Sequence, residues 1–226
     1  MIVLVAGMPR SGSTFSFNVG REVLLARGRV HQEAIHDVAG ALERSGKADH
    51  VLLKAHAVDH ATMALARHGA LRTVITVRRI EDSIASWIDT FGWSDEETVR
   101  HLRDWIQLYI GLRGVALIVP YEQVDRRPAW AAWRIARFLH PGVSPFEVLR
   151  IARKFSRARV RAHADALTAD GEGVIDIGFS FYDGQTYFHR RHVSGPRSRP
   201  ARERVPTARL DYVTAALGAD IAAAGL

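Results

Sequence analysis

The sequence predicts an α/β fold with a central parallel sheet covered by helices on both faces, and two observations predict it. Short apolar runs alternate with amphipathic helical segments, a pattern typical of parallel sheets buried between helices. The first apolar run, residues 2–6 (IVLVA), ends in a glycine-rich turn that opens a helix. A length of 226 residues suits one domain. We therefore expect a single domain over residues 1–226.

Four apolar runs predict the strands of this sheet. The run at 2–6 stops at Gly7, as a buried strand does where a turn follows. Three later runs have the same length and β-branched character: residues 51–55 (VLLKA), 73–77 (TVITV) and 115–119 (VALIV). Because a helical segment follows each run, we expect the strands to be parallel and their carboxyl ends to meet at one edge.

Segments with helical periodicity link and follow these strands. They span residues 15–25, 59–68, 81–89, 95–112, 128–139, 145–167 and 207–223. Ser94 precedes the fourth segment and is predicted to cap its N-terminus. The stretch 169–206 is rich in glycine, proline and arginine and has little periodicity, so we expect it to consist mainly of loops.

Composition excludes several classes of protein. Hydrophobic residues make up 47% of the chain and charged residues 24%, which is the mixture of a globular protein. The absence of cysteine excludes a disulfide scaffold, a thiolate metal site and a cysteine nucleophile. No apolar run approaches the roughly 18 residues that span a bilayer, and no signal peptide is recognisable. We expect a cytoplasmic protein without a membrane span.

The formal net charge of +7 includes a notable local excess. Residues 189–204 (HRRHVSGPRSRPARER) hold six arginines against Glu203 alone. Such a segment is either a solvated tail or an arm that binds anions.

The loop after the first strand has the pattern of a phosphate-binding site. Residues 7–14 (GMPRSGST) follow the spacing GxxxxGK[ST], but Ser13 stands where the lysine belongs. The preceding strand and following helix place backbone N–H groups and a helix N-terminus around an anion. The cation of the loop is instead Arg10, three positions earlier. The predicted fold is thus P-loop NTPase-like, without the lysine that kinases use.

The stretch PRSGSTF, from Pro9 to Phe15, resembles the 5′-phosphosulfate loop of sulfotransferases that use 3′-phosphoadenosine 5′-phosphosulfate (PAPS), usually PKSGTTW. The resemblance continues at the end of the second predicted strand, where Lys54 and His56 match the family's K-T-H segment. The residues support this independently, because a strand-end histidine can accept a proton from a hydroxyl near neutral pH.

The family's 3′-phosphate signature is an arginine that ends the third strand and a serine eight residues later. Arg78 and Ser86 have this spacing. A strand-end guanidinium suits a bidentate contact with a phosphate. Alone, the pair is equally typical of the start of a surface helix.

Two later stretches resemble the family as well. Arg190 and Arg191 begin a segment similar to its R-K-G-x-x-G motif, with His192 in place of the first glycine. Tyr121 follows the fourth predicted strand and resembles the tyrosine that approaches adenine, while Phe15 stands where tryptophan offers a stacking face.

The resemblance implies a PAPS-dependent sulfotransferase that transfers a sulfuryl group to a hydroxyl or amine. His56 would be the general base, with Lys54 and Arg10 assisting catalysis. It implies donor contacts from Arg10, Ser11, Gly12, Ser13, Thr14, Phe15, Arg78, Ser86, Tyr121, Arg190 and Arg191. The released product is adenosine 3′,5′-bisphosphate, and no metal is required.

Other functions remain compatible with the sequence. A small-molecule kinase with a degenerate loop lacks the lysine and a strand-end acid for Mg²⁺. A basic nucleic-acid-binding protein would lack any recognisable module, and an inactive protein that binds the donor product remains open. The acceptor is expected to be a small molecule or carbohydrate. Four aromatic residues lie near the expected acceptor cleft: Trp87, Phe91, Trp93 and Trp105. We expect some of them to belong to the core and others to line the acceptor site.

Overall fold

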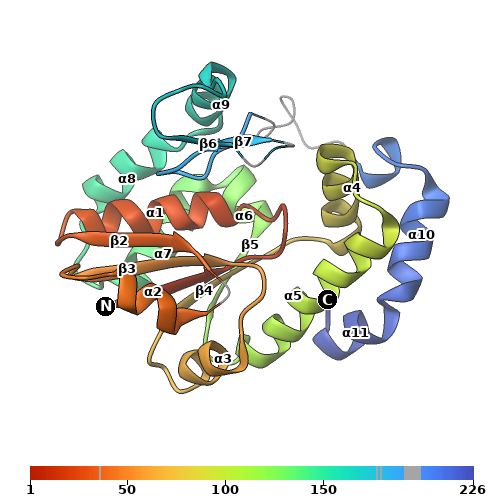
Figure 1. The fold of residues 1–226 in the computed structure, drawn as a ribbon, viewed down its shortest axis with the longest axis horizontal. Coiled ribbons are helices and arrows are strands. Elements are labelled where there is room, and N and C mark those ends of the chain that lie inside the picture. Colours follow the sequence, from red (N-terminus) through yellow and green to blue (C-terminus); the bar gives the residue numbers. More distant parts are fainter. Residues whose placement is uncertain (36, 177, 179, 191–199) are drawn as a thin grey trace.

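The computed structural model describes residues 1–35, 37–176, 178, 180–190 and 200–226. Its centre is a parallel five-stranded sheet in the order β2-β3-β1-β4-β5 (Figure 1). The strands span Ile2–Ala6 (β1), Val30–Ala34 (β2), His50–Ala55 (β3), Arg72–Val77 (β4) and Leu117–Pro120 (β5). The predicted α/β class with a parallel sheet is confirmed.

Helices cover both faces of the sheet. On one face lie α1 (Ser13–Leu25), α7 (Pro128–Leu139) and α8 (Pro145–Lys154). The opposite face carries α2 (Val38–Arg44), α3 (His60–Arg67) and α5 (Asp95–Leu112), and α10 (Thr207–Ala216) packs on the outer side of α5. The alternation along β1 explains the two layers, because Val3 and Val5 enter one core cluster while Leu4 and Ala6 enter the other.

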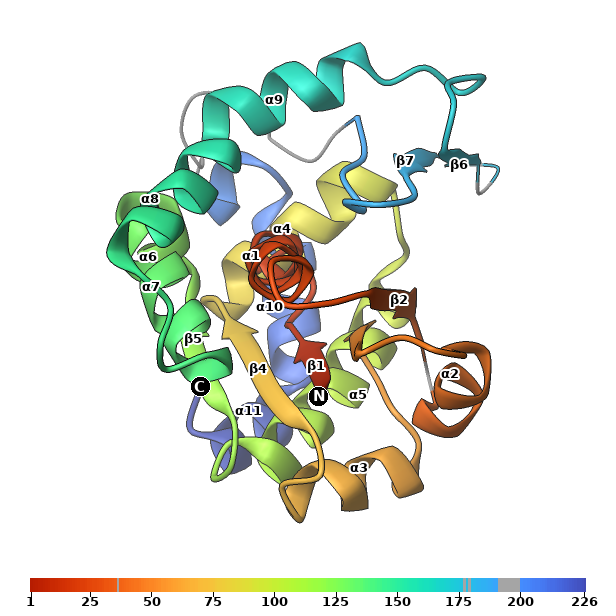
Figure 2. The same cartoon turned by 90° about the vertical axis from the view of Figure 1, so that its left-hand side faces the viewer.

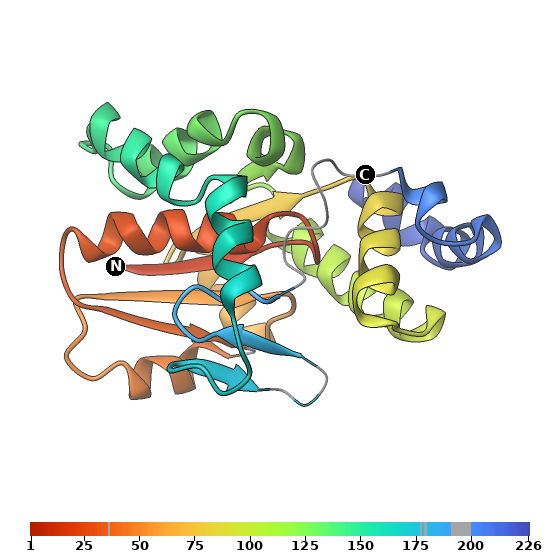
Figure 3. The ribbon, with the colours of Figure 1, turned by 90° about the horizontal axis from the view of Figure 1, so that it is seen from above.

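The remaining elements surround the edge where the strands end. They are α4 (Ile80–Phe91), α6 (Tyr121–Arg126), α9 (Arg157–Ala166), β6 (Val174–Asp176), β7 (Phe181–Asp183), the 3₁₀ turn Ala201–Glu203 and α11 (Gly218–Ala224). Seen from above, α9 crosses α1, the β6–β7 hairpin lies beside α1 over the orange strands, and α4 stands beyond the ends of the strands (Figure 3). Within the described ranges, no helix has the length and apolar character needed to cross a bilayer.

The sequence did not predict the outer strand β2 or the helix α2 that follows it. The strand reads VHQEA and has no apolar run, because it pairs with β3 on one side only and its side chains make polar contacts. An edge strand of this kind lacks the continuous hydrophobicity by which buried parallel strands are recognised.

Two predicted helices are each divided in the structure. The segment 145–167 forms α8 and α9, because Phe155 and Ser156 leave the helical conformation and Phe155 turns into the core. The final segment, 207–223, forms α10 and α11, which meet at Leu217. By contrast, the predicted cap at Ser94 is confirmed as a full capping box with Glu97.

Candidate functional site

The loop after β1 is shaped by close approach of the chain to itself. A Cβ atom on Gly7 would lie 2.3 Å from the Cβ of Ser13 and 2.4 Å from Oγ1 of Thr76, so only glycine fits. Gly12 has φ +85°, a left-handed conformation that glycine adopts at little cost. It caps α1 without a side-chain acceptor, so the first N–H groups of the helix have no side-chain cap.

Hydroxyl groups hold this loop against the neighbouring strand and helix. Oγ of Ser11 donates to the carbonyl of Met8 at 2.5 Å and also lies 2.5 Å from Oγ1 of Thr76. Oγ of Ser83, on α4, donates to the carbonyl of Pro9 at 2.6 Å. The backbone N–H of Ser11 also donates to the carbonyl of Met8, at 3.2 Å. Ser11 is therefore engaged within the loop through both its side chain and its N–H, and it is not among the residues that line the cavity described below.

Arg10 brings its charge to the centre of the site. Its φ is +61°, which is unusual for a residue with a side chain. Nε donates to Oγ of Ser86 at 3.1 Å, and Nη1 lies 2.9 Å from Nε2 of His189. Burial, and next the charge of Arg204, lowers the pKa of Arg10 to about 10. The guanidinium remains charged near neutral pH although it is enclosed by protein.

Arg78, at the end of β4, connects the loop to the opposite wall. Its Nη1 donates to the carbonyl of Arg10 at 3.1 Å. Its guanidinium carbon lies 4.1 Å from the ring centre of Tyr121, which begins α6. Arg78 is only 8% exposed. The predicted pair Arg78 and Ser86 thus both contact Arg10, Arg78 at its backbone carbonyl and Ser86 at its guanidinium.

Lys54 and His56 come from the adjacent end of β3. Burial, followed by the charge of Arg10, lowers the pKa of Lys54 to about 8. Its Nζ lies 5.5 Å from the ring centre of Tyr187. Nδ1 of His56 lies 2.6 Å from the carbonyl oxygen of Gly7. Because a carbonyl only accepts, Nδ1 carries the proton and Nε2 is the basic nitrogen of the neutral ring.

These groups line one cavity of about 510 Å³ at the carboxyl ends of β3, β1 and β4. Of the residues predicted for the site, its lining includes Arg10, Gly12, Ser13, Thr14, Phe15, Lys54, His56, Arg78, Ser86 and Tyr121. Adjacent parallel strands thus bring together residues that are far apart in the sequence. Within the described ranges, no group of three His, Asp or Glu residues forms a candidate metal site.

An aromatic wall forms another part of this cavity. Trp87, Phe91 and Trp93 contribute to it, as the sequence suggested for some of these residues. The ring centres of Trp87 and His56 are 6.4 Å apart. Trp105, in contrast, is fully buried in the core and donates its Nε1 hydrogen to the carbonyl of Ala6 at 3.2 Å.

Sequence reasoning missed the contribution of residues 155–189 to the site. Lining residues from this stretch include Phe155, Arg157, Tyr182, Tyr187, Phe188 and His189. The cluster of aromatic residues at 181–188 was the available signal. Arg190 is exposed and follows the last lining residue of this segment. Arg191 and His192 lie outside the described residues.

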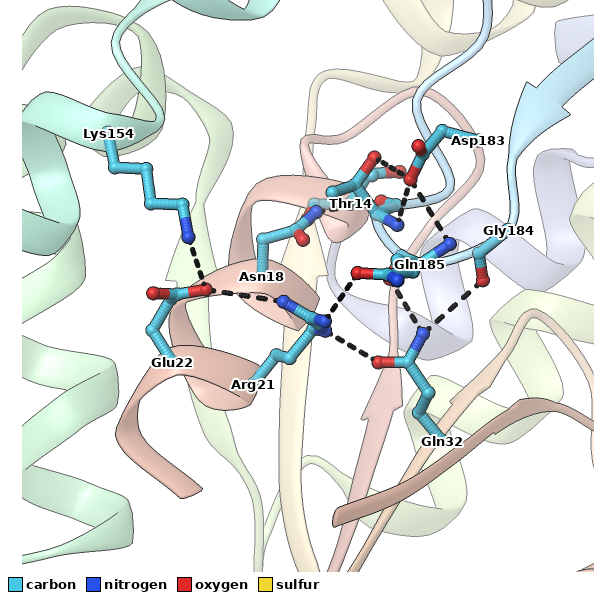
Figure 4. A network of polar contacts seen from close by, with 10 residues as sticks. Thr14, Asn18, Arg21, Glu22, Gln32, Lys154, Asp183, Gly184 and Gln185 are labelled. Atoms are coloured by element: carbon cyan, nitrogen blue, oxygen red, sulfur yellow. Dashed lines mark hydrogen bonds and ion pairs between the residues drawn. The ribbon is translucent and has the colours of Figure 1, made fainter. Parts of the chain in front are cut away.

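A polar network attaches the segment after β7 to α1 and β2 (Figure 4). Arg21 donates through Nε to Oε1 of Gln32 at 2.7 Å and through Nη2 to Oε1 of Gln185 at 2.9 Å. Nε2 of Gln32 donates to the carbonyl of Gln185 at 2.7 Å. Nδ2 of Asn18 donates to the carbonyl of Thr186 at 2.8 Å. The network positions the aromatic residues that follow Thr186.

Solved structures resemble this arrangement over nearly the whole chain. Mouse sulfotransferase SULT7A1, complexed with PAP, matches 98% of this chain and 84% of its own, with 13% identity and a TM-score of 0.66. The chain has the sulfotransferase fold. Retinol dehydratase matches in two complexes with PAP, with androsterone at a TM-score of 0.60 and with retinol at 0.61. Each has 14% identity, covering 97% of this chain and 80% or 81% of the other.

Neither a family profile nor a curated protein matches the chain by sequence. The chain therefore resembles these structures in fold, while its sequence identity to them is low. In this fold, the loop of Arg10 follows β1, Lys54 and His56 lie at the end of β3, and Arg78 follows β4.

Proposed function

We propose that the protein is a PAPS-dependent sulfotransferase that acts on a hydroxyl or amine of a small-molecule or carbohydrate acceptor. One observation carries the proposal. A single cavity contains an anion-binding loop, the cations Arg10, Lys54 and Arg78, and His56, whose basic nitrogen is Nε2. The sulfotransferase fold and the PAP in the similar structures support the same function.

The donor end of the cavity fits a nucleotide with two phosphate groups. The N–H groups at the start of α1, with the hydroxyls of Ser13 and Thr14, suit a 5′-phosphate. Arg78 and Ser86 suit a 3′-phosphate, to which Arg190 and Arg191 would add charge. Phe15 and Tyr121 offer rings to adenine, and the glycine at position 12 leaves room for close approach by the ligand.

PAPS supplies the sulfuryl group, whose bond to the 5′-phosphate oxygen breaks as its bond to the acceptor oxygen or nitrogen forms. His56 accepts the acceptor's proton on Nε2 and keeps its own proton on Nδ1, where the carbonyl of Gly7 holds the ring. Lys54 and Arg10 offset negative charge that develops on the sulfuryl oxygens and on the departing phosphate.

The acceptor end favours a substrate with an apolar body. Trp87, Phe91 and Trp93 line the cavity beside His56, so a ring or chain on these side chains would leave its hydroxyl near Nε2. Retinol dehydratase, one of the similar structures, was solved with androsterone and with retinol. The aromatic lining of this cavity and the ligands of that protein support an acceptor screen that begins with apolar alcohols and phenols and extends to sugars.

Calorimetric titration separates this function from a kinase. We expect adenosine 3′,5′-bisphosphate to bind in a 1:1 complex and ATP with Mg²⁺ to bind weakly, because Ser13 replaces the phosphate-loop lysine and the ends of β3 and β4 carry cations. Preference for ATP with Mg²⁺ would instead establish the kinase. Binding of the bisphosphate without turnover of PAPS across the acceptor panel would identify an inactive relative.

A titration with duplex DNA tests the basic nucleic-acid-binding alternative. Salt-sensitive binding of the duplex, without any response to the bisphosphate, would contradict the sulfotransferase proposal. Competition between the two ligands would instead place the duplex on the phosphate sites of the cavity.

A further inference from the structure

Besides residues 189–204, a second part of the chain is rich in positive charge. Residues 126–161, from the end of α6 into α9, contain ten arginines and lysines but one acidic residue, Glu147. Figure 2 shows α7 and α8 together at one side of the molecule, with α9 above them. This side therefore carries an excess of basic residues, although Lys154, Arg157 and Arg161 form ion pairs with Glu22, Asp125 and Asp165.

Helix α8 presents an exposed stripe that is both apolar and cationic. Phe146 is 85% exposed and Leu149 is 43% exposed. Arg150 and Arg153 are also exposed. The spacing i, i+3, i+4 and i+7 places all four on one face, because successive residues in a helix are about 100° apart. The other side of the helix, which includes Val148, is buried.

Helix α7 repeats this pattern. Residues 130–137 (WAAWRIAR) and 146–153 (FEVLRIAR) both place apolar residues at the first and fourth positions and arginines at the fifth and eighth. Trp130 is 52% exposed, and the guanidinium of Arg137 lies 5.5 Å from the ring centre of Trp133. The opposite sides of both helices enter the same core cluster. The stripe of α8 faces away from this cluster, whereas on α7 Trp133 is half-buried and packs against it, and Trp130 and Arg137 are exposed.

Much of this charge is available to a partner. Glu147 is engaged by Arg27, with Nη1 and Oε1 2.8 Å apart. Among the described residues, Arg150 and Arg153 form no ion pair. A second copy of the chain does not suit the surface, because face-to-face contact would bring two cationic sides together. The partner must be anionic and must also accept apolar side chains.

We propose that the exposed stripes of α7 and α8 form a docking surface for an anionic lipid bilayer. Phe146, Leu149 and Trp130 enter the boundary between headgroups and acyl chains, while the arginines beside them contact lipid phosphates. Duplex DNA is less suited to the surface, since its phosphates would attract the arginines but its paired, stacked bases offer no apolar phase in which Phe146, Leu149 and Trp130 are buried. The contact is peripheral and does not depend on the function of the cavity.

Sedimentation with vesicles tests this surface in the full-length chain. We expect binding to phosphatidylcholine vesicles that contain phosphatidylserine, weakening as salt increases, and little binding to phosphatidylcholine alone. The double variants Phe146→Ser/Leu149→Ser and Arg150→Gln/Arg153→Gln should each lower the partition coefficient by about tenfold or more.

A matched double variant on α3, Leu65→Ser/Arg67→Gln, replaces exposed residues of the same kinds and should bind like the wild type. Thermal unfolding of every variant checks that it is folded. Wild-type binding by the Phe146→Ser/Leu149→Ser protein would overturn the proposal, because the contact would then be purely electrostatic. Absence of vesicle binding, or binding to duplex DNA alone, would also overturn it.

Discussion

His56 is held in the orientation that a general base requires. Its Nδ1–H is directed at the carbonyl of Gly7, and Nε2 is the basic nitrogen. We expect His56→Asn to lower kcat for sulfuryl transfer by about 10²–10⁴ and to leave the affinity for adenosine 3′,5′-bisphosphate unchanged. His68→Asn, an exposed histidine at the end of α3, is the control. Wild-type turnover by His56→Asn would exclude it as the base.

The lowered pKa of Lys54 predicts a pH dependence. Burial and then Arg10 lower that pKa to about 8, so the ammonium is charged below this pH and loses its charge above it. If Lys54 offsets charge on the sulfuryl group, kcat/KM should fall as the pH rises through about 8, because kcat/KM reports the free enzyme. The measurement is a kcat/KM profile from neutral to alkaline pH.

Lys54→Arg provides the test of that assignment. Arginine keeps its charge throughout this range, so the fall in kcat/KM near the pKa of Lys54 should disappear even if overall activity is lower. An unchanged alkaline fall in the variant would assign it to another group.

Arg78 gives a prediction about recognition of the 3′-phosphate. Wild-type protein should bind adenosine 3′,5′-bisphosphate about tenfold to a hundredfold more tightly than adenosine 5′-phosphate, the range expected for hydrogen bonds to a charged group. Arg78→Gln should largely remove this preference, as measured by calorimetry with both nucleotides. Arg72→Gln, at the opposite end of β4, should retain it. Equal preference in both variants would exclude Arg78 from this role.

At this scale the sequence predicted the positions of His56, Lys54 and Arg78, because strand ends and motif spacing are local features. The contact between Arg10 and His189 was not predictable. It joins residues 179 positions apart and depends on the conformation of the chain after β7. The positive φ of Arg10 could not be predicted from the sequence either, because arginine, unlike glycine, has no preference for that conformation.

Among the elements, the β6–β7 hairpin reaches the cavity through Tyr182, and the segment after it is held by polar contacts to β2. Gln32→Ala would remove hydrogen bonds to the carbonyls of Gly184 and Gln185, at 3.3 and 2.7 Å. We expect amide hydrogen exchange of residues 181–190 to become about tenfold faster, because a net hydrogen bond contributes roughly 1 kcal/mol. Acceptor KM should rise more than kcat falls.

Gln107→Ala supplies the control for the hairpin. Its Nε2 donates to Asp220 at 3.1 Å, between α5 and α11, and the substitution should leave exchange in the hairpin unchanged. If Gln32→Ala also leaves this exchange unchanged, the polar network does not restrain the segment.

The elements differ in how well their sequence predicts them. The capping box at Ser94 uses a local pattern, and it was predicted correctly. Strands β6 and β7 have three residues each, too few for an alternating pattern, and their hairpin pairing brings together residues such as Val174 and Asp183. The break between α8 and α9 was missed because Phe155 continues the apolar pattern while its backbone departs from the helix.

For the molecule as a whole, we propose that residues 1–226 form one domain and unfold together. Circular dichroism and tryptophan fluorescence should then give coincident thermal transitions. A hundredfold excess of adenosine 3′,5′-bisphosphate over its Kd should add about 2.7 kcal/mol of stability and raise both midpoints by roughly 5–10 °C. Separate transitions, of which only one responds to the bisphosphate, would contradict the single domain.

The order of the sheet also has a consequence for biosynthesis. Strand β1 lies between β3 and β4, yet the ribosome makes it before both of them. Until Val77 has left the exit tunnel, this very apolar strand has an incomplete set of partners. A nascent chain that pauses earlier exposes the edges of β1 to other chains or to chaperones. Codons between positions 50 and 77 are therefore where slow translation should most reduce the yield of folded protein.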